Sequence, residues 1–201
     1  KILIFLCIDV RTGGPYERVG RVGQIPRLLS HKYTKKQAGN QCRIPGQGRK
    51  LVLTPTPVKI WAQDNNIEVF DNHNLLSKNY DLFLVASYGK IIPKEIFEIP
   101  KHKTLNIHPS LLPKYRGASP IQSQILNVAD SEQSEEKENN IGVTIMQIEE
   151  KMDTGPIVIQ KKVESEMLGR KELEKTLAIE GARLFAHILP EWLMGAIDPI
   201  M

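Results

Sequence analysis

Residues Thr104 to Gln122 read T-L-N-I-H-P-S-L-L-P-K-Y-R-G-A-S-P-I-Q, and the interpretation of the whole chain starts from this stretch. Side chains alternate between the two faces of a strand, so Asn106 and His108 are expected to project from the same side. The prolines that follow stop a regular ladder and predict a shaped loop before a helix from Ile121 to Leu126. Because open α/β sheets build their sites at the carboxyl ends of strands, we place the chemistry here.

Apolar segments of strand and helix length predict the fold class. Ile2 to Ile8 is a continuous apolar run, which is typical of a parallel strand buried on both faces, and Tyr80 to Ala86 is another. Lys171 to Leu193 repeats apolar residues at helical spacing, although Gly181 weakens its middle and Pro190 is expected to break or kink it. We therefore predict a Rossmann-like α/β fold, an open, mostly parallel twisted sheet with helices on both faces.

Shorter patterns complete the expected architecture. Further strands are expected at 67–70, 104–108, 141–148 and 157–163, and further helices at 57–64 and 94–99. The length of 201 residues suits one domain, which we place at residues 1–194. Within it, residues 9–42 are atypical, and residues 129–140 are an acidic, low-complexity loop insertion. Residues 195–201 are expected to begin a linker to an absent C-terminal domain.

Composition and charge narrow the function classes. Hydrophobic residues at 41% and charged residues at 25% describe an ordinary globular protein. No apolar run approaches the roughly 20 residues that span a bilayer, so no membrane partner is expected. Cys7 and Cys42 form neither a metal-spaced pair nor a disulfide framework. His102 and His108 are not expected to converge, so we predict no metal.

The charge of the chain is unevenly distributed. Residues 1–60 hold twelve Lys and Arg but two Asp and Glu, a net charge of +10, whereas the remainder carries −6. Three of these cations, Arg43, Arg49 and Lys50, belong to a Gly- and Pro-punctuated basic loop predicted from Asn40 to Lys50. A block this basic suggests a polyanionic partner such as RNA, although a solvated basic face without a partner remains an alternative.

Two blocks of the sequence resemble a known family. N-I-H-P-S-L-L-P-K-Y-R-G-A-S-P-I-Q, from Asn106 to Gln122, is similar to the signature of the folate-dependent formyltransferases. G-V-T-I-M-Q-I-E-E-K-M-D-T-G-P-I, from Gly142 to Ile157, is similar to the second block of that family. The resemblance is greatest to the tRNA-specific members and extends from about Gly46 to about Ile159, whereas residues 1–40 depart from the pattern.

The chemistry that the resemblance implies is consistent with the residue types. Formyl transfer to an amine develops an oxyanion and releases a proton. The Asn106 amide can donate to that oxyanion, and His108 can stabilise it as a cation or shuttle the proton. Asp153 is expected to orient and charge the imidazole. The resemblance implies that these residues are the catalytic trio.

The resemblance also implies the substrates and their contacts. The donor would be 10-formyltetrahydrofolate and the acceptor the α-amino group of initiator methionyl-tRNA. The implied folate contacts are Tyr88, Gly89, Lys90, Ile91, Ile92, Ser110, Leu111, Leu112 and Pro113. The tRNA-specific members carry a G-R-G-K-K-like loop, and the corresponding residues here are Gln47, Arg49 and Lys50. Gln47 replaces the usual arginine and removes one cation.

Other functions remain open at this stage. The chain could be another formyl-folate enzyme, either a sugar-nucleotide formyltransferase or a formyl-folate hydrolase. It could also be a catalytically inactive RNA-binding relic, because its N-terminal third is atypical. We further expect a monomer in the mitochondrial matrix, with the bacterial cytoplasm as the alternative compartment.

Overall fold

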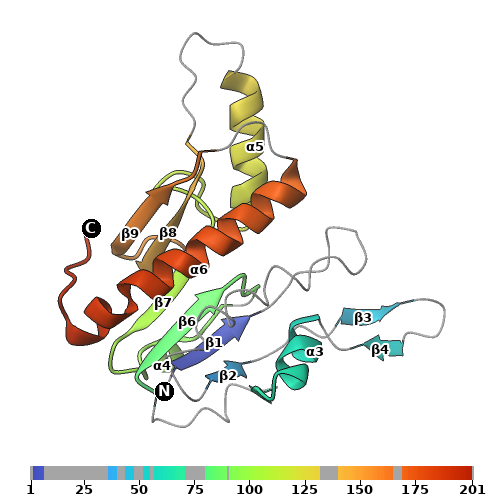
Figure 1. Ribbon diagram of the computed structural model, residues 1–201, viewed down its shortest axis with the longest axis vertical. Helices are drawn as coiled ribbons and strands as arrows, with labels where there is room; N and C mark the ends of the chain where they lie inside the picture. Colours follow the sequence, from blue (N-terminus) through green and yellow to red (C-terminus); the bar gives the residue numbers. More distant parts are fainter. Residues whose placement is uncertain are drawn as a thin grey trace. The chain divides into compact units, whose positions relative to one another are not determined.

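The structure is a computed structural model with two compact units, Lys1–Thr104 and Leu105–Met201. It describes residues 2–6, 36–39, 44–47, 52–54, 57–70, 80–89, 91–131, 140–164 and 169–200 (Figure 1). In these residues no helix combines the length and the apolar character that crossing a membrane requires.

The first unit contains a parallel sheet with the strand order β5-β2-β1-β6. Its strands are β1 (Ile2–Leu6), β2 (Lys36–Gly39), β5 (Glu68–Phe70) and β6 (Leu82–Ala86). Leu82, Phe83 and Leu84 are fully buried, which confirms the apolar run of β6 as a strand covered on both faces. The helices α3 (Pro57–Asp64) and α4 (Lys94–Phe97) confirm the predicted short helices.

The segment predicted as a basic loop, Asn40 to Lys50, is in part a strand. β3 (Ile44–Gln47) pairs antiparallel with β4 (Val52–Thr54), with an irregular register between them. The alternation of this segment was obscured by Pro45 and Gly46, which are unusual inside a strand but tolerated at an edge or bulge.

The second unit is built on antiparallel strands and two helices. Its strands are β7 (Thr104–His108), β8 (Gly142–Gln147) and β9 (Ile157–Lys162), and its helices are α5 (Pro120–Ser131) and α6 (Arg170–Met194). β8 pairs with β7 on one side and with β9 on the other, both antiparallel. Leu173 and Leu177 of α6 pack with Ile141 and Val163, and α5 adds partly buried isoleucines to this cluster.

Both helices of the second unit extend further than predicted. α5 continues to Ser131, which is beyond Leu126 and enters the segment 129–140 that was assigned to a loop. Its sequence has no glycine or proline after Pro120, so nothing in the backbone stops the helix at Leu126.

Pro190 lies inside α6 and does not break it, so of the two predicted outcomes, a break or a kink, the break is wrong. The helix runs through it to Met194 and closes at Gly195, whose φ of 69° and N–H bond to the Trp192 carbonyl form a left-handed cap. A proline in a helix interior costs about 3 kcal/mol. Leu189 and Trp192 are buried beside it, and burial of such side chains contributes about 1.5–3 kcal/mol each, which offsets that cost.

Gly181 lets α6 lie close to the sheet rather than merely weakening the helix. Figure 1 shows α6 crossing the face of β7 and β8. A Cβ atom at Gly181 would lie 2.6 Å from Ile107 Cγ2 and 3.2 Å from Val143 Cγ2, closer than packed carbon atoms normally approach. The absence of a side chain therefore sets the spacing between helix and strands.

We expect Gly181→Ala to destabilise the protein. Alanine gains about 1 kcal/mol of helix propensity over glycine, whereas overpacking a core costs about 1–3 kcal/mol. Chemical denaturation of the wild type and the variant measures the difference. In an Ile107→Ala background the clash with the Ile107 methyl is gone, so the same substitution should become neutral or stabilising. Equal effects in both backgrounds would contradict the packing argument.

Candidate active site

β7 presents different chemistry on its two faces. Ile107 faces Gly181 of α6, and it pairs across the sheet with Ile145 of β8. Asn106 and His108 alternate with these apolar residues and therefore occupy the other face, as predicted. His108 is buried, with 4% of its surface exposed, and Asn106 is half-buried.

The loop between β8 and β9 carries Asp153 to the end of β7. The loop is closed by a hydrogen bond from the Gln147 N–H to the Pro156 carbonyl, at 2.9 Å. A side chain at Gly155 would collide with the Gln147 carbonyl oxygen, so this tight return requires glycine. Asp153 itself adopts a φ of 54°, a left-handed conformation that aspartate tolerates better than most residues.

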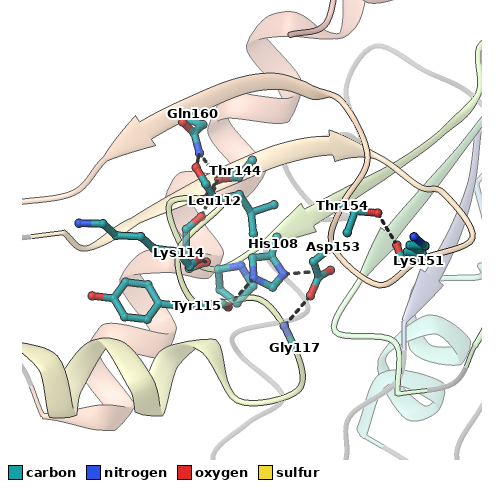
Figure 2. A network of polar contacts seen from close by, with 12 residues as sticks. His108, Leu112, Lys114, Tyr115, Gly117, Thr144, Lys151, Asp153, Thr154 and Gln160 are labelled. Atoms are coloured by element: carbon teal, nitrogen blue, oxygen red, sulfur yellow. Dashed lines mark hydrogen bonds and ion pairs between the residues drawn. The ribbon is translucent and has the colours of Figure 1, made fainter. Parts of the chain in front are cut away.

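Asp153 contacts both His108 and the loop that follows it. One carboxylate oxygen lies 3.5 Å from Nδ1 of His108, and the other accepts a 2.8 Å hydrogen bond from the Gly117 N–H. Figure 2 shows the carboxylate between these two groups, with the Tyr115 ring directed away from the imidazole. Nε2 of His108 lies 3.2 Å from the Tyr115 carbonyl, so both ring nitrogens face oxygen atoms of the protein.

Burial and the neighbouring charge act on the pKa of His108 in opposite directions. Burial lowers the pKa of the imidazole below its ordinary value of 6.5, and this outweighs the opposing effects of the Asp153 charge and the Tyr115 carbonyl. The ring is therefore neutral at pH 7. The Asp153 charge acts in the predicted direction, because it raises this pKa, but desolvation of the cation is the larger effect.

Each nitrogen of the imidazole faces an oxygen acceptor, so a second proton on the ring would have a partner. A neutral imidazole has one N–H and can satisfy only one of the two facing oxygens, whichever tautomer it adopts. A protonated ring donates to both the Tyr115 carbonyl and the Asp153 carboxylate. The geometry suits a general base that is neutral before the reaction and whose cationic form faces two acceptors, the Tyr115 carbonyl and the Asp153 carboxylate.

A row of polar side chains beside His108 was not predicted from the sequence. In the sheet register His108 lies opposite Thr144 of β8, and Thr144 lies opposite Gln160 of β9. Thr144 and Gln160 bind the backbone of the loop after β7 (Figure 2). The available signal was a polar residue in the apolar run G-V-T-I-M, but only the pairing register shows what it faces.

The structure describes the remaining predicted site residues without testing their roles. Ser110 and Leu112 are buried, Leu111 is half-buried and Pro113 is exposed. In the first unit Ile91 is 83% exposed whereas Ile92 is buried, so only Ile91 presents an apolar surface. Tyr88 is half-buried, Gly89 has open space beside it, and Gln47 pairs with Val52. Lys90, Arg49 and Lys50 lie outside the described residues.

The described residues bring together His108 and Asp153, with Asn106 on the same face of β7. The Asn106 side chain makes no hydrogen bond to another described residue. No group of three or more His, Cys, Asp or Glu in the described part of the chain is placed to hold a metal ion.

Comparison with known proteins identifies the family. A sequence model described as formyl transferase matches residues 46–188, which is most of the chain and includes Asn106, His108 and Asp153. The chain belongs to the formyl transferase family. Methionyl-tRNA formyltransferase of a Sulfurihydrogenibium species is 41% identical over 163 residues, covering 76% of this chain and 50% of the relative. That of Halalkalibacterium halodurans is 36% identical over 186 residues, covering 87% and 55%.

These relatives are bacterial, and this formyl transferase chain spans about half the length of the curated relatives it matches.

Solved structures confirm the predicted α/β fold. An N-formyltransferase from Helicobacter canadensis, in complex with folinic acid and dTDP-3-aminofucose, has a TM-score of 0.67 at 20% identity, covering 100% of this chain and 66% of that one. Phosphoribosylglycinamide formyltransferase from Anaplasma phagocytophilum has a TM-score of 0.61 at 18% identity, covering 96% and 86%.

We expect the pKa of His108 to fall further in Asp153→Asn. Asparagine can keep the hydrogen bond from Gly117 but removes the charge that raises the pKa of the ring, so burial acts unopposed by a carboxylate. NMR titration of the histidine ring protons in the wild type and the variant measures the shift. A higher pKa in the variant would show that Asp153 does not stabilise the imidazolium.

The same pKa predicts how stability depends on pH. Because the folded protein binds a proton at His108 less readily than the unfolded chain, the free energy of unfolding decreases as the pH falls from 6.5 through the lower folded pKa. His108→Gln should flatten this decrease, as measured by denaturation at several pH values. Thr104→Val, which removes a different buried polar contact, should keep the wild-type slope.

Proposed function

We propose that this chain transfers the formyl group of 10-formyltetrahydrofolate to the α-amino group of initiator methionyl-tRNA. The observation that carries the proposal is the contact between His108 and Asp153 on the face of β7 that also bears Asn106. These residues lie in the region matched to the formyl transferase family.

Each residue has a separate task in this reaction. The Asn106 amide, which has no hydrogen bond to another described residue, donates to the oxyanion that develops on the formyl oxygen. A carbon–nitrogen bond forms to the attacking amine, and the bond to the folate nitrogen breaks. His108 takes the proton from the amine and returns it to the departing nitrogen. Asp153 stabilises the imidazolium in the interval.

The burial of His108 adds a requirement to this mechanism. Its side chain is 5% exposed and Nε2 faces the Tyr115 carbonyl. Proton transfer through Nε2 therefore requires the bound substrates to displace this carbonyl. Neutral His108 is the form that can accept a proton, and this agrees with its lowered pKa.

The curated relatives favour methionyl-tRNA as the acceptor over the alternatives. Those at 36–41% identity are named methionyl-tRNA formyltransferase. The structural neighbours that act on other acceptors are near 20% identity and support the fold alone. The predicted contacts of Gln47, Arg49 and Lys50 with tRNA stay predictions, as do the monomeric state and the mitochondrial matrix, while the bacterial relatives favour the cytoplasmic alternative.

A formylation assay tests the proposal. Purified protein is given 10-formyltetrahydrofolate and methionyl-tRNA, and formyl-methionyl-tRNA and free formate are both measured. Asn106→Ala should lower kcat by about 10²–10³-fold and His108→Ala by about 10²–10⁴-fold. His187→Ala, at an exposed histidine of α6, is the matched control and should retain activity.

The outcomes separate the alternatives. Formate release without formylated tRNA would indicate a formyl-folate hydrolase, and formylation of an amino sugar nucleotide alone would indicate a sugar-specific enzyme. Binding of tRNA without turnover or folate binding would indicate the inactive relic. Any of these results would contradict the proposal.

A further inference from the structure

The loop that follows β7 is held by hydrogen bonds from side chains rather than by backbone pairing with a neighbouring strand. The Thr144 hydroxyl donates to the Ser110 carbonyl at 2.6 Å and accepts from the Leu112 N–H at 3.1 Å. Nε2 of Gln160 donates to the Leu112 carbonyl at 2.7 Å and to the Thr144 hydroxyl at 2.8 Å. The peptide groups of this loop that would otherwise be buried without partners are thereby satisfied.

A third side chain anchors the beginning of the same loop. Nε2 of Gln124, on α5, donates to the Pro109 carbonyl at 2.6 Å and to the Pro120 carbonyl at 3.1 Å. Its Oε1 accepts from the Gly142 N–H at 3.2 Å, at the start of β8. We call Gln124, Thr144 and Gln160 the polar brace.

Thr144 is the centre of the polar brace. It is fully buried, and its hydroxyl uses its single proton and its lone pairs in the contacts with Ser110, Leu112 and Gln160. The buried donor and acceptor of the loop have no water to replace a lost partner, so removing this hydroxyl leaves them unpaired. The loop would then have to shift to regain hydrogen bonds.

We call residues 109–112, which the polar brace holds, the braced loop; it connects His108 to predicted folate contacts. It begins directly after His108, and it contains Ser110, Leu111 and Leu112. It then leads to Tyr115 and Gly117, which contact His108 and Asp153. Its backbone position therefore determines both the setting of the imidazole and the placement of the loop side chains.

We propose that Thr144, supported by Gln160 and Gln124, is a positioning residue that holds the loop at Ser110–Leu112 in the conformation that binds the pterin-containing donor. This inference rests on the proposed function. Thr144 is fully buried and bonds the loop backbone, so its loss should weaken donor binding while leaving recognition of the formyl acceptor unchanged.

Binding of folinic acid, a stable formyl-folate, tests the proposal in the full chain by calorimetry. Thr144→Val keeps the side-chain shape but removes the hydroxyl, and should raise the Kd on the order of tenfold, the effect of losing about one net hydrogen bond. Thr144→Ser restores the hydroxyl and should bind nearly as the wild type does. In the formylation assay Thr144→Val should raise the KM for the donor and not that for methionyl-tRNA.

Thr104→Val is the matched control for loss of stability. Thr104 is also buried, and its hydroxyl also donates to a backbone carbonyl, that of Phe97, at 2.6 Å. It lies outside the braced loop, so its loss should lower the free energy of unfolding without changing the Kd. Hydrogen exchange should show faster exchange at the Leu112 N–H in Thr144→Val alone.

The results discriminate clearly. If Thr144→Val binds folinic acid as the wild type does, or if Thr104→Val weakens binding equally, the hydroxyl is only structural and the proposal is wrong. Wild-type protein that binds no folinic acid would contradict the proposed function itself and this inference with it. Weakened binding in Thr144→Val, with recovery in Thr144→Ser, supports the positioning role of Thr144 and a formyl-folate as the donor.

Discussion

The Asp153 carboxylate is the contact on which the site depends. One of its oxygens faces His108 and the other accepts the Gly117 N–H, so a single side chain links the end of β7, the loop that follows it and the β8–β9 return. The β8–β9 return is distant in sequence from the other two segments, since Asp153 lies 36 residues after Gly117. An ionised carboxylate can serve both partners because it offers several acceptor positions, whereas an amide or hydroxyl offers fewer.

The balance between burial and charge decides the state of the imidazole. Burial disfavours the cation, while the Asp153 charge and the Tyr115 carbonyl favour it, and burial is the larger effect. The result is a ring that is neutral at neutral pH yet surrounded by acceptors for both of its nitrogens. A histidine more exposed to water would charge more easily, and one without Asp153 would resist charging more strongly.

Packing and polar contacts place these groups from opposite faces of the strands β7, β8 and β9. On one face Ile107 and Val143 meet Gly181 of α6, and the missing side chain permits the close approach. On the other face a row of polar side chains crosses the strands at His108, Thr144 and Gln160. The packing on the apolar face stabilises the strands. On the polar face, the register of the strands places Thr144 and Gln160 where they can bond the loop after β7.

The sequence alone determined the fold class, the existence of most elements and the family, and it gave Asn106, His108 and Asp153 as candidate site residues. Strand periodicity was sufficient to place Asn106 and His108 on one face, because periodicity is a local property of the sequence. Two motif blocks were sufficient to recognise the family, because they depend on residue type and order. Local patterns were insufficient at Pro190, where buried neighbours override a helix breaker, and at Ile44–Gln47, where a proline and a glycine concealed a strand.

Only the tertiary structure decided how the reactive groups interact. The contact of Asp153 with His108, the neutral state of the ring and the register that sets Thr144 beside the loop all join residues distant in the chain. The burial of a side chain and the register of two strands depend on how the whole unit packs. Neither can be read from a local sequence pattern. The residue types were therefore predictable, whereas their distances and protonation were not.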